Sequence, residues 1–143
     1  MSKANLFREF NLPFGNLHEA RSRLAELEQR REMLQRQGRE MTREFRERYP
    51  TAPAYPAKYS DRTLTGWRWR RARHRAVSFD LLGEAGRELL DALPDPVRRQ
   101  WLDFERRRLF LNLALALADY ERLRLRDFLA HVERLRELER AGQ

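Results

Sequence analysis

Two long stretches of apolar residues at helical spacing constrain the fold of this chain more than any other feature. In the first stretch, residues 17–48, an apolar side chain recurs every three or four positions, and most of the remaining positions are charged or amide residues. This spacing places the apolar residues on one face of a helix. Tyr49 ends the pattern, because the residue before Pro50 is disfavoured in the helical region. We therefore predict a helix over residues 17–48, whose apolar face is interrupted by Arg31 and Gly38.

The second stretch covers residues 96–140. Pro94 breaks the preceding pattern, and Pro96 suits the first position of a new helix. We predict that the two long helices pair as an antiparallel hairpin, which would bury Leu24 and Leu27. Apolar residues occupy several faces of the second helix, so its partner helix cannot cover them all. The excess predicts a homodimer or another protein partner. The residues assigned to that interface are Leu109, Leu113, Leu117 and Tyr120.

The segment between the two helices has a different pattern. Residues 51–60 are rich in proline and predict an extended connector. Residues 63–79 alternate between apolar and polar side chains, which indicates a small β-hairpin with a turn at residues 71–73. Leu64 is out of step with this alternation, so we expect a bulge at Gly66. An isolated hairpin is marginally stable in water, so it should lie against the helices.

Residues 81–93 complete the fold class. Their pattern predicts a short helix that ends before Pro94. The predicted fold is mainly α: a long antiparallel helical hairpin with an inserted β-hairpin and a short helix. A chain of 143 residues fits a single domain, residues 1–143.

Positive charge is concentrated between the two long helices. The chain carries a net charge of +8, and residues 43–75 contain ten cations and three acids, or +7. Residues 62–75 contain six arginines and no acid. Because guanidinium binds phosphate bidentately, this segment predicts contact with a nucleic-acid backbone, and a two-stranded ribbon fits the major groove of duplex DNA. The residues assigned to that contact are Arg62, Arg68, Arg70, Arg71, Arg73 and Arg75.

The same arginines have two other interpretations. Arg68 and Arg70 alternate with Trp67 and Trp69, so they could form the solvated face of a strand whose tryptophans pack inward. They could also pair with acids of the long helices. Binding to a membrane surface is a weaker interpretation, because no lipid anchor and no exposed aromatic-basic helix is evident.

The sequence offers little for catalysis or metal binding. The chain has no cysteine, and its three histidines, His18, His74 and His131, do not have ligand spacing on a helix. No glycine-rich phosphate loop is present. We predict no catalytic residue, no metal site and no cofactor. The absence of cysteine fits a reducing, cytoplasmic location. The longest apolar run, residues 109–118, is too short to cross a bilayer, so no membrane association is expected.

Three short segments carry a resemblance to a known family. They are Trp67-Arg68-Trp69-Arg70, then Ala92-Leu93-Pro94 with Arg98, and then Glu105 to Leu113 with Asn112 inside it. Residues 66–125 thereby resemble small accessory proteins of bacterial integrative conjugative elements, some of which are described as integrase regulators. The resemblance implies an accessory role on a mobile genetic element and transfers no active residue.

Two functional hypotheses follow. The first is a non-enzymatic DNA-binding or regulatory accessory protein that contacts the phosphate backbone through an arginine-rich hairpin. The second is a protein–protein adaptor or inhibitor that acts through the apolar faces of the last helix and has no nucleic-acid role.

Overall fold

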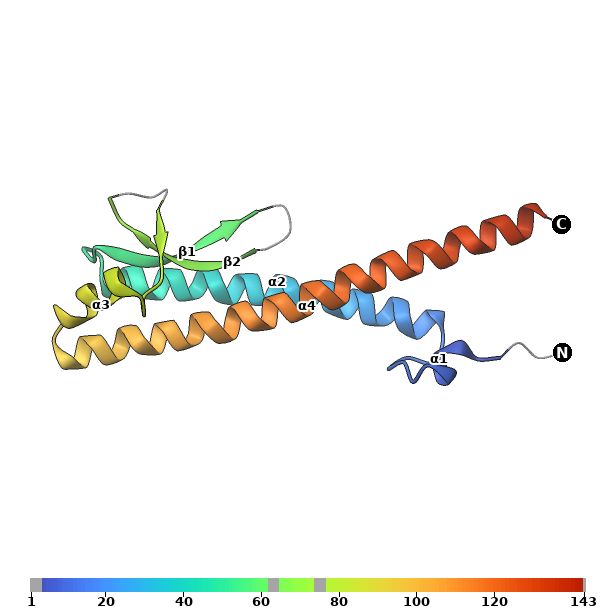
Figure 1. The fold of residues 1–143 in the computed structure, drawn as a ribbon, viewed down its shortest axis with the longest axis horizontal. Helices are drawn as coiled ribbons and strands as arrows, with labels where there is room; N and C mark the ends of the chain where they lie inside the picture. The colour runs from blue at the N-terminus through green and yellow to red at the C-terminus, as the bar shows by residue number, and fades with distance from the viewer. Residues whose placement is uncertain (1–3, 62–64, 74–76, 143) are drawn as a thin grey trace. The chain divides into compact units, whose positions relative to one another are not determined.

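The computed structural model describes residues 4–61, 65–73 and 77–142. The fold is mainly helical (Figure 1). Along the chain, the segment between the two long helices forms a small antiparallel sheet and a short helix. The elements are α1 (Leu6–Glu9), α2 (Leu17–Arg48), β1 (Ala54–Ser60), β2 (Thr65–Arg71), β3 (Ser78–Phe79), α3 (Glu84–Asp91) and α4 (Asp95–Ala141). The chain divides into two compact units, one of Met1–Arg31 with Leu117–Gln143 and one of Glu32–Ala116. Each unit contains a segment of α2 and a segment of α4.

The long helices begin and end close to the predicted residues. At the start of α2, the Asn16 side chain accepts a hydrogen bond from the Glu19 backbone N–H at 2.8 Å, and the Glu19 carboxylate accepts one from the Gly15 N–H at 2.5 Å. These bonds satisfy N–H groups that a helix start leaves without partners. The helix ends at Arg48, before Tyr49-Pro50, as predicted.

Within each unit, the segments of α2 and α4 run antiparallel, which confirms the predicted pairing. In the first unit Arg23 pairs with Glu121 and Arg31 pairs with Asp119. In the second unit the Phe45 ring packs on Trp101 and Phe104. Leu27 is buried, as predicted, whereas Leu24 is only half-buried. Leu24 lies two helical turns before Arg31, on the same side of α2. Because Arg31 is also half-buried, this side of the helix is only partly covered at both positions.

The sheet has three strands in the order β1-β2-β3, rather than the two predicted. Strand β1 pairs with β2 without a break from Ala54↔Arg71 to Ser60↔Thr65, while β3 pairs with β2 only at Trp69 and Arg70. The predicted connector over residues 51–60 was therefore wrong, since most of it forms β1. Residues 63–64 and 74–76 of the predicted hairpin lie outside the described residues.

Two residues explain why the sheet differs from the prediction. Pro56 lacks a backbone N–H, but a proline is tolerated on an edge strand such as β1. Its carbonyl accepts a hydrogen bond from the Thr42 hydroxyl of α2 at 2.7 Å. Gly66 forms no bulge, because it pairs in register with Tyr59. A Cβ atom at Gly66 would lie 3.0 Å from both the Tyr59 ring and the Asn112 side chain, so glycine is needed there for a close approach.

The core of the second unit is aromatic. Trp67, Trp69, Trp101 and Phe45 are fully buried. The Trp69 and Trp101 rings stack with centroids 5.4 Å apart, and Phe45 meets both edge-on. Such pairs stabilise a core by about 0.5–1.5 kcal/mol beyond the burial of their area. The inner face of the sheet is thereby fixed to the helices, which leaves its other face for function.

Helix α3 is shorter than predicted, starting at Glu84 instead of residue 81. The reason is a turn just before it, in which the Asp80 side chain accepts from the Leu82 N–H and the Asp80 carbonyl accepts from the Gly83 N–H. An aspartate that binds the backbone two residues on favours a turn over a helix.

Candidate nucleic-acid interface

Strand β2 presents tryptophans on one face and arginines on the other. Trp67 and Trp69 have no exposed surface. The indole N–H of Trp69 donates to Glu105 of α4 at 2.8 Å, and that of Trp67 donates to the Thr42 hydroxyl at 3.1 Å. Because both tryptophans are buried and hydrogen-bonded, they are not available to stack on bases.

Helix α4 also holds the backbone of β2. The Asn112 side chain accepts from the Trp67 N–H and donates to the Trp67 carbonyl, each at 2.9 Å. Strand β3 pairs with β2 only further along, so Asn112 takes the place of a strand residue at Trp67. This role accounts for an asparagine inside the longest apolar run. Arg108 donates to the same carbonyl at 3.1 Å and pairs with the buried Glu105.

The outer face of the sheet follows from the register. Neighbouring residues of a strand point to opposite sides, and paired residues share a side. Arg68 and Arg70 therefore lie opposite the tryptophans, beside their partners Ala57 and Tyr55. Tyr59, two residues from Ala57, shares this face. The outer face thus combines two arginines with two half-buried tyrosines.

Four of the six predicted nucleic-acid-binding arginines belong to the described residues. Arg68 and Arg73 are exposed, Arg70 and Arg71 are half-buried, and Arg62 and Arg75 lie outside the described residues. Among the described residues, no acid of the long helices lies within ion-pair distance of these four arginines. The interpretation that they pair with acids of the long helices is therefore wrong for Arg68, Arg70, Arg71 and Arg73. Their charge remains available to a partner.

Aromatic rings lie against two of these four arginines, Arg68 and Arg71, and against Arg46 of α2. The Arg68 guanidinium carbon lies 3.6 Å from the centre of the Tyr59 ring, and that of Arg46, on α2, lies 4.4 Å from the Tyr55 ring. Arg71 lies 5.4 Å from the Phe79 ring. A cation over an aromatic face is stabilised by about 0.5–1 kcal/mol at an exposed site.

Sequence reasoning missed three members of this site: Arg46, Tyr55 and Tyr59. Tyr55 and Tyr59 are four residues apart, which puts both on one face of a strand. That signal was hidden because the prolines around Tyr55 predicted a connector.

The residues assigned to a protein interface are exposed in both units. In the second unit Leu109 is 50% exposed and Leu113 is 59% exposed, with Phe110 beside them. In the first unit Leu117 is 62% exposed and Tyr120 is 65% exposed. The protein interface itself stays a prediction.

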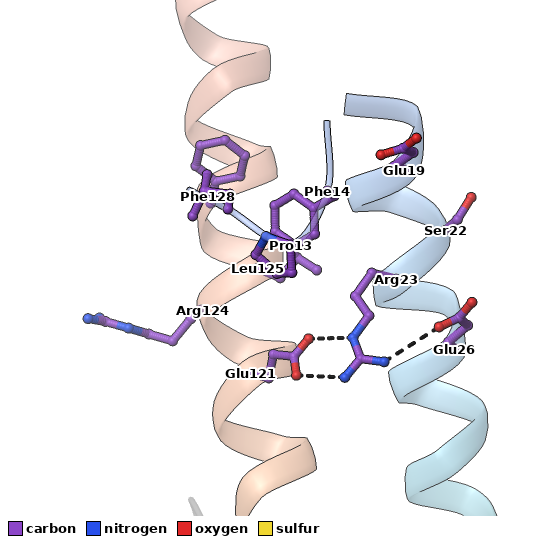
Figure 2. Close-up of a pocket in the computed structure, with 11 residues that line it drawn as sticks. Pro13, Phe14, Glu19, Ser22, Arg23, Glu26, Glu121, Arg124, Leu125 and Phe128 are labelled. Carbon is purple, nitrogen blue, oxygen red and sulfur yellow. Dashed lines mark hydrogen bonds and ion pairs between the residues drawn. The ribbon is translucent and has the colours of Figure 1, made fainter. Parts of the chain in front are cut away.

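The first unit contains a pocket of about 870 Å³ (Figure 2). Its apolar wall includes Phe14, Leu125 and Phe128. At its base Arg23 binds the Glu121 carboxylate through two nitrogen atoms, at 2.5 and 2.8 Å. The Arg23 guanidinium lowers the pKa of Glu121 and Glu121 raises the pKa of Arg23, which stabilises the charged pair. Since these two charges already satisfy one another, the pocket offers a ligand mainly its apolar wall.

The part of the chain that the structure describes contains neither a metal-binding cluster nor a membrane-spanning helix. No three histidine, aspartate or glutamate side chains come together there as they would around a metal ion. None of the helices built from these residues is both long and apolar enough to cross a bilayer.

The outer face of the sheet is therefore an unneutralised arginine surface on an antiparallel helical scaffold. No family model, curated protein or solved structure matches this chain.

Proposed function

We propose that the protein is a non-enzymatic accessory protein that binds DNA through the arginines of its β-sheet. The observation that carries this proposal is that Arg68, Arg70, Arg71 and Arg73 lie together on β2 and its turn with no acidic partner. Several arginines elsewhere in the chain are paired, such as Arg107 with Glu44 and Arg122 with Asp119. Arg68 and Arg70 share the outer face of the sheet, with Arg71 and Arg73 next to them in the sequence, and a phosphate backbone supplies anions for these charges.

The fold supports this role by presenting the arginines on a rigid surface. Buried tryptophans fix β2 to α2 and α4, and Asn112 holds its backbone. A charged surface that is fixed before binding loses less conformational entropy when it meets a ligand. The resemblance to accessory proteins of integrative conjugative elements suggests the setting, a bacterial mobile genetic element, in which such a protein would act in the cytoplasm on DNA.

Replacing Arg68, Arg70, Arg71 and Arg73 together by glutamine tests the proposal. For the wild type, four phosphate contacts predict that log affinity falls with log salt at a slope of roughly −3 to −4. Binding should weaken by about 60- to 250-fold between about 50 and 200 mM salt. The variant should lose most of this slope. Fluorescence anisotropy with labelled DNA at several salt concentrations measures both quantities.

A matched control separates a specific surface from net charge. Arg21, Arg30, Arg36 and Arg39 are exposed residues of α2, and none forms an ion pair with the described acids. Changing these four to glutamine lowers the charge of +8 by the same four units. This control should keep most of the binding. If both variants lose it equally, or if the wild type binds no DNA at about 50 mM salt, the proposal fails.

The exposed apolar residues of α4 support a second candidate function, protein–protein association without nucleic acid. Large exposed apolar patches usually mark an interface. If two copies of the chain associate through Leu109 and Leu113, sedimentation velocity should show a dimer. Replacing both residues by glutamine should then shift the dissociation constant upward by at least about 10-fold.

The control for this test replaces Leu135 and Leu138 by glutamine. Both are exposed residues of α4 in the first unit, so the overall loss of apolar surface is similar. A wild type that stays monomeric at high concentration would exclude self-association and leave only a different protein as the partner.

A further inference from the structure

The outer face of the sheet carries two arginine–tyrosine stacks that the phosphate contacts do not explain. One joins Arg68 to Tyr59 across β2 and β1, and the other joins Arg46 of α2 to Tyr55 of β1. At 3.6 Å, the Arg68 guanidinium is at van der Waals distance from the centre of the ring beneath it. Both arginines are exposed, so each has surface that its tyrosine does not cover.

A guanidinium plane backed by an aromatic ring is a good surface for a flat partner. Bases stack on aromatic side chains and on arginine planes, but only when the base faces are free. In a duplex those faces are occupied by neighbouring base pairs. Tyrosine–arginine stacks therefore favour unpaired nucleotides over a double helix.

The layout of the face suits an extended strand. Tyr55 and Tyr59 are four residues apart on β1, which separates them by about 13 Å. Ala57, which lies between them, has a short side chain and is buried. Arg70 shares this face, and its guanidinium donates to the Lys58 backbone carbonyl at 3.5 Å. It places positive charge near the path between the two stacks.

We infer that this face binds single-stranded nucleic acid, with unpaired bases stacked on the guanidinium groups of Arg46 and Arg68 and with phosphates held by neighbouring cations. The inference rests on the proposed function and names its substrate class. Duplex binding, which the sequence favoured, is the competing outcome.

Replacing Arg46 and Arg68 together by lysine isolates stacking from charge. Lysine keeps the positive charge but has no flat group to stack. Stacking contributes about 1–3 kcal/mol per base, so affinity for an oligothymidine of about 20 nucleotides should fall at least about 10-fold. The salt slope should stay as in the wild type, because the number of charges is unchanged. Affinity for a duplex of the same length should also be unchanged.

The control variant changes Arg36 and Arg39 to lysine. Both are exposed residues of α2 outside the sheet, and neither lies over an aromatic ring of the described residues. This control should bind the oligothymidine within about twofold of the wild type. Thermal melting of all variants confirms that they are folded, which is expected because the substituted side chains are exposed.

The outcomes separate this inference from the proposed function. The inference is overturned if the wild type binds duplex as tightly as the single strand and the lysine variant behaves like its control. The proposed function, DNA binding, would still stand in that case. Absence of binding to either nucleic acid overturns both. Preference for the single strand that is lost in the Arg46→Lys, Arg68→Lys variant supports both.

Discussion

Replacing Glu105 by alanine is expected to lower the free energy of unfolding by about 3–5 kcal/mol. Glu105 is only 3% exposed and accepts hydrogen bonds from the Trp69 indole at 2.8 Å and from Arg108 at 2.9 Å. The Arg108 side chain is itself 15% exposed, so removing Glu105 leaves a nearly buried cation without its partner. It also leaves the indole N–H of Trp69 without an acceptor in the core.

Urea unfolding followed by circular dichroism measures this loss, and Asp103→Ala is the matched control. Asp103 also lies on α4 and pairs with the arginine three residues later, but both side chains of that pair are more than two-thirds exposed. An exposed pair typically contributes about 0–1 kcal/mol. Equal losses in the two variants would show that burial of Glu105 has no energetic consequence, contrary to the structure.

The long helices could be predicted from the sequence because their signal is local. Apolar spacing and the proline breaks are contained in the segment that they describe, and the structure confirms α2 over Leu17–Arg48. The two interruptions on the apolar face of α2 could not be explained in the same way. Arg31 binds Asp119 at 2.7 Å, and Gly38 faces the Trp67 ring. Both depend on residues far away in the chain, which no periodicity identifies.

Strand β1 shows a different limit of sequence reasoning. Pro53 and Pro56 argue against a central strand, because a proline has no backbone N–H to donate to a neighbouring strand. Whether a strand lies at an edge is decided by the order of the sheet, and that order is a tertiary property. A connector has no defined faces, so its prediction over residues 51–60 hides the face that Tyr55 and Tyr59 share, and with it the two tyrosines of the candidate site.

The segments behind the family resemblance turn out to contact one another. Trp69 binds Glu105, and Trp67 binds Asn112. Arg98 donates to the carbonyl of Leu90 in α3 and to that of Leu93, which follows the helix. These contacts hold the sheet and α3 to α4. The resemblance therefore rests mostly on residues that stabilise the fold, while Arg68 and Arg70 are the members that lie on the outer face of the sheet.

Replacing Gly38 by alanine is expected to destabilise the protein by about 1–3 kcal/mol, although the residue lies within a helix. Helix propensity alone predicts the opposite sign, a gain of about 1 kcal/mol for alanine over glycine. The structure decides between these effects, because a Cβ atom at Gly38 would overlap the six-membered ring of the Trp67 indole. Trp67 has no exposed surface and its indole N–H is bound to Thr42, so the ring has nowhere to move.

A double-mutant cycle with Trp67→Phe tests this cause directly. Phenylalanine lacks the fused ring that approaches Gly38, so in that background the added methyl group has space, and helix propensity should dominate. Gly38→Ala should therefore destabilise the wild type but be neutral or stabilising in the Trp67→Phe variant, with a coupling free energy of about 1–3 kcal/mol between the two positions. Chemical denaturation of the four proteins gives this value. If Gly38→Ala has the same cost in both backgrounds, the Trp67 ring is not what requires glycine at position 38. A gain of stability in the wild type would show that α2 and the sheet pack less closely than the structure indicates.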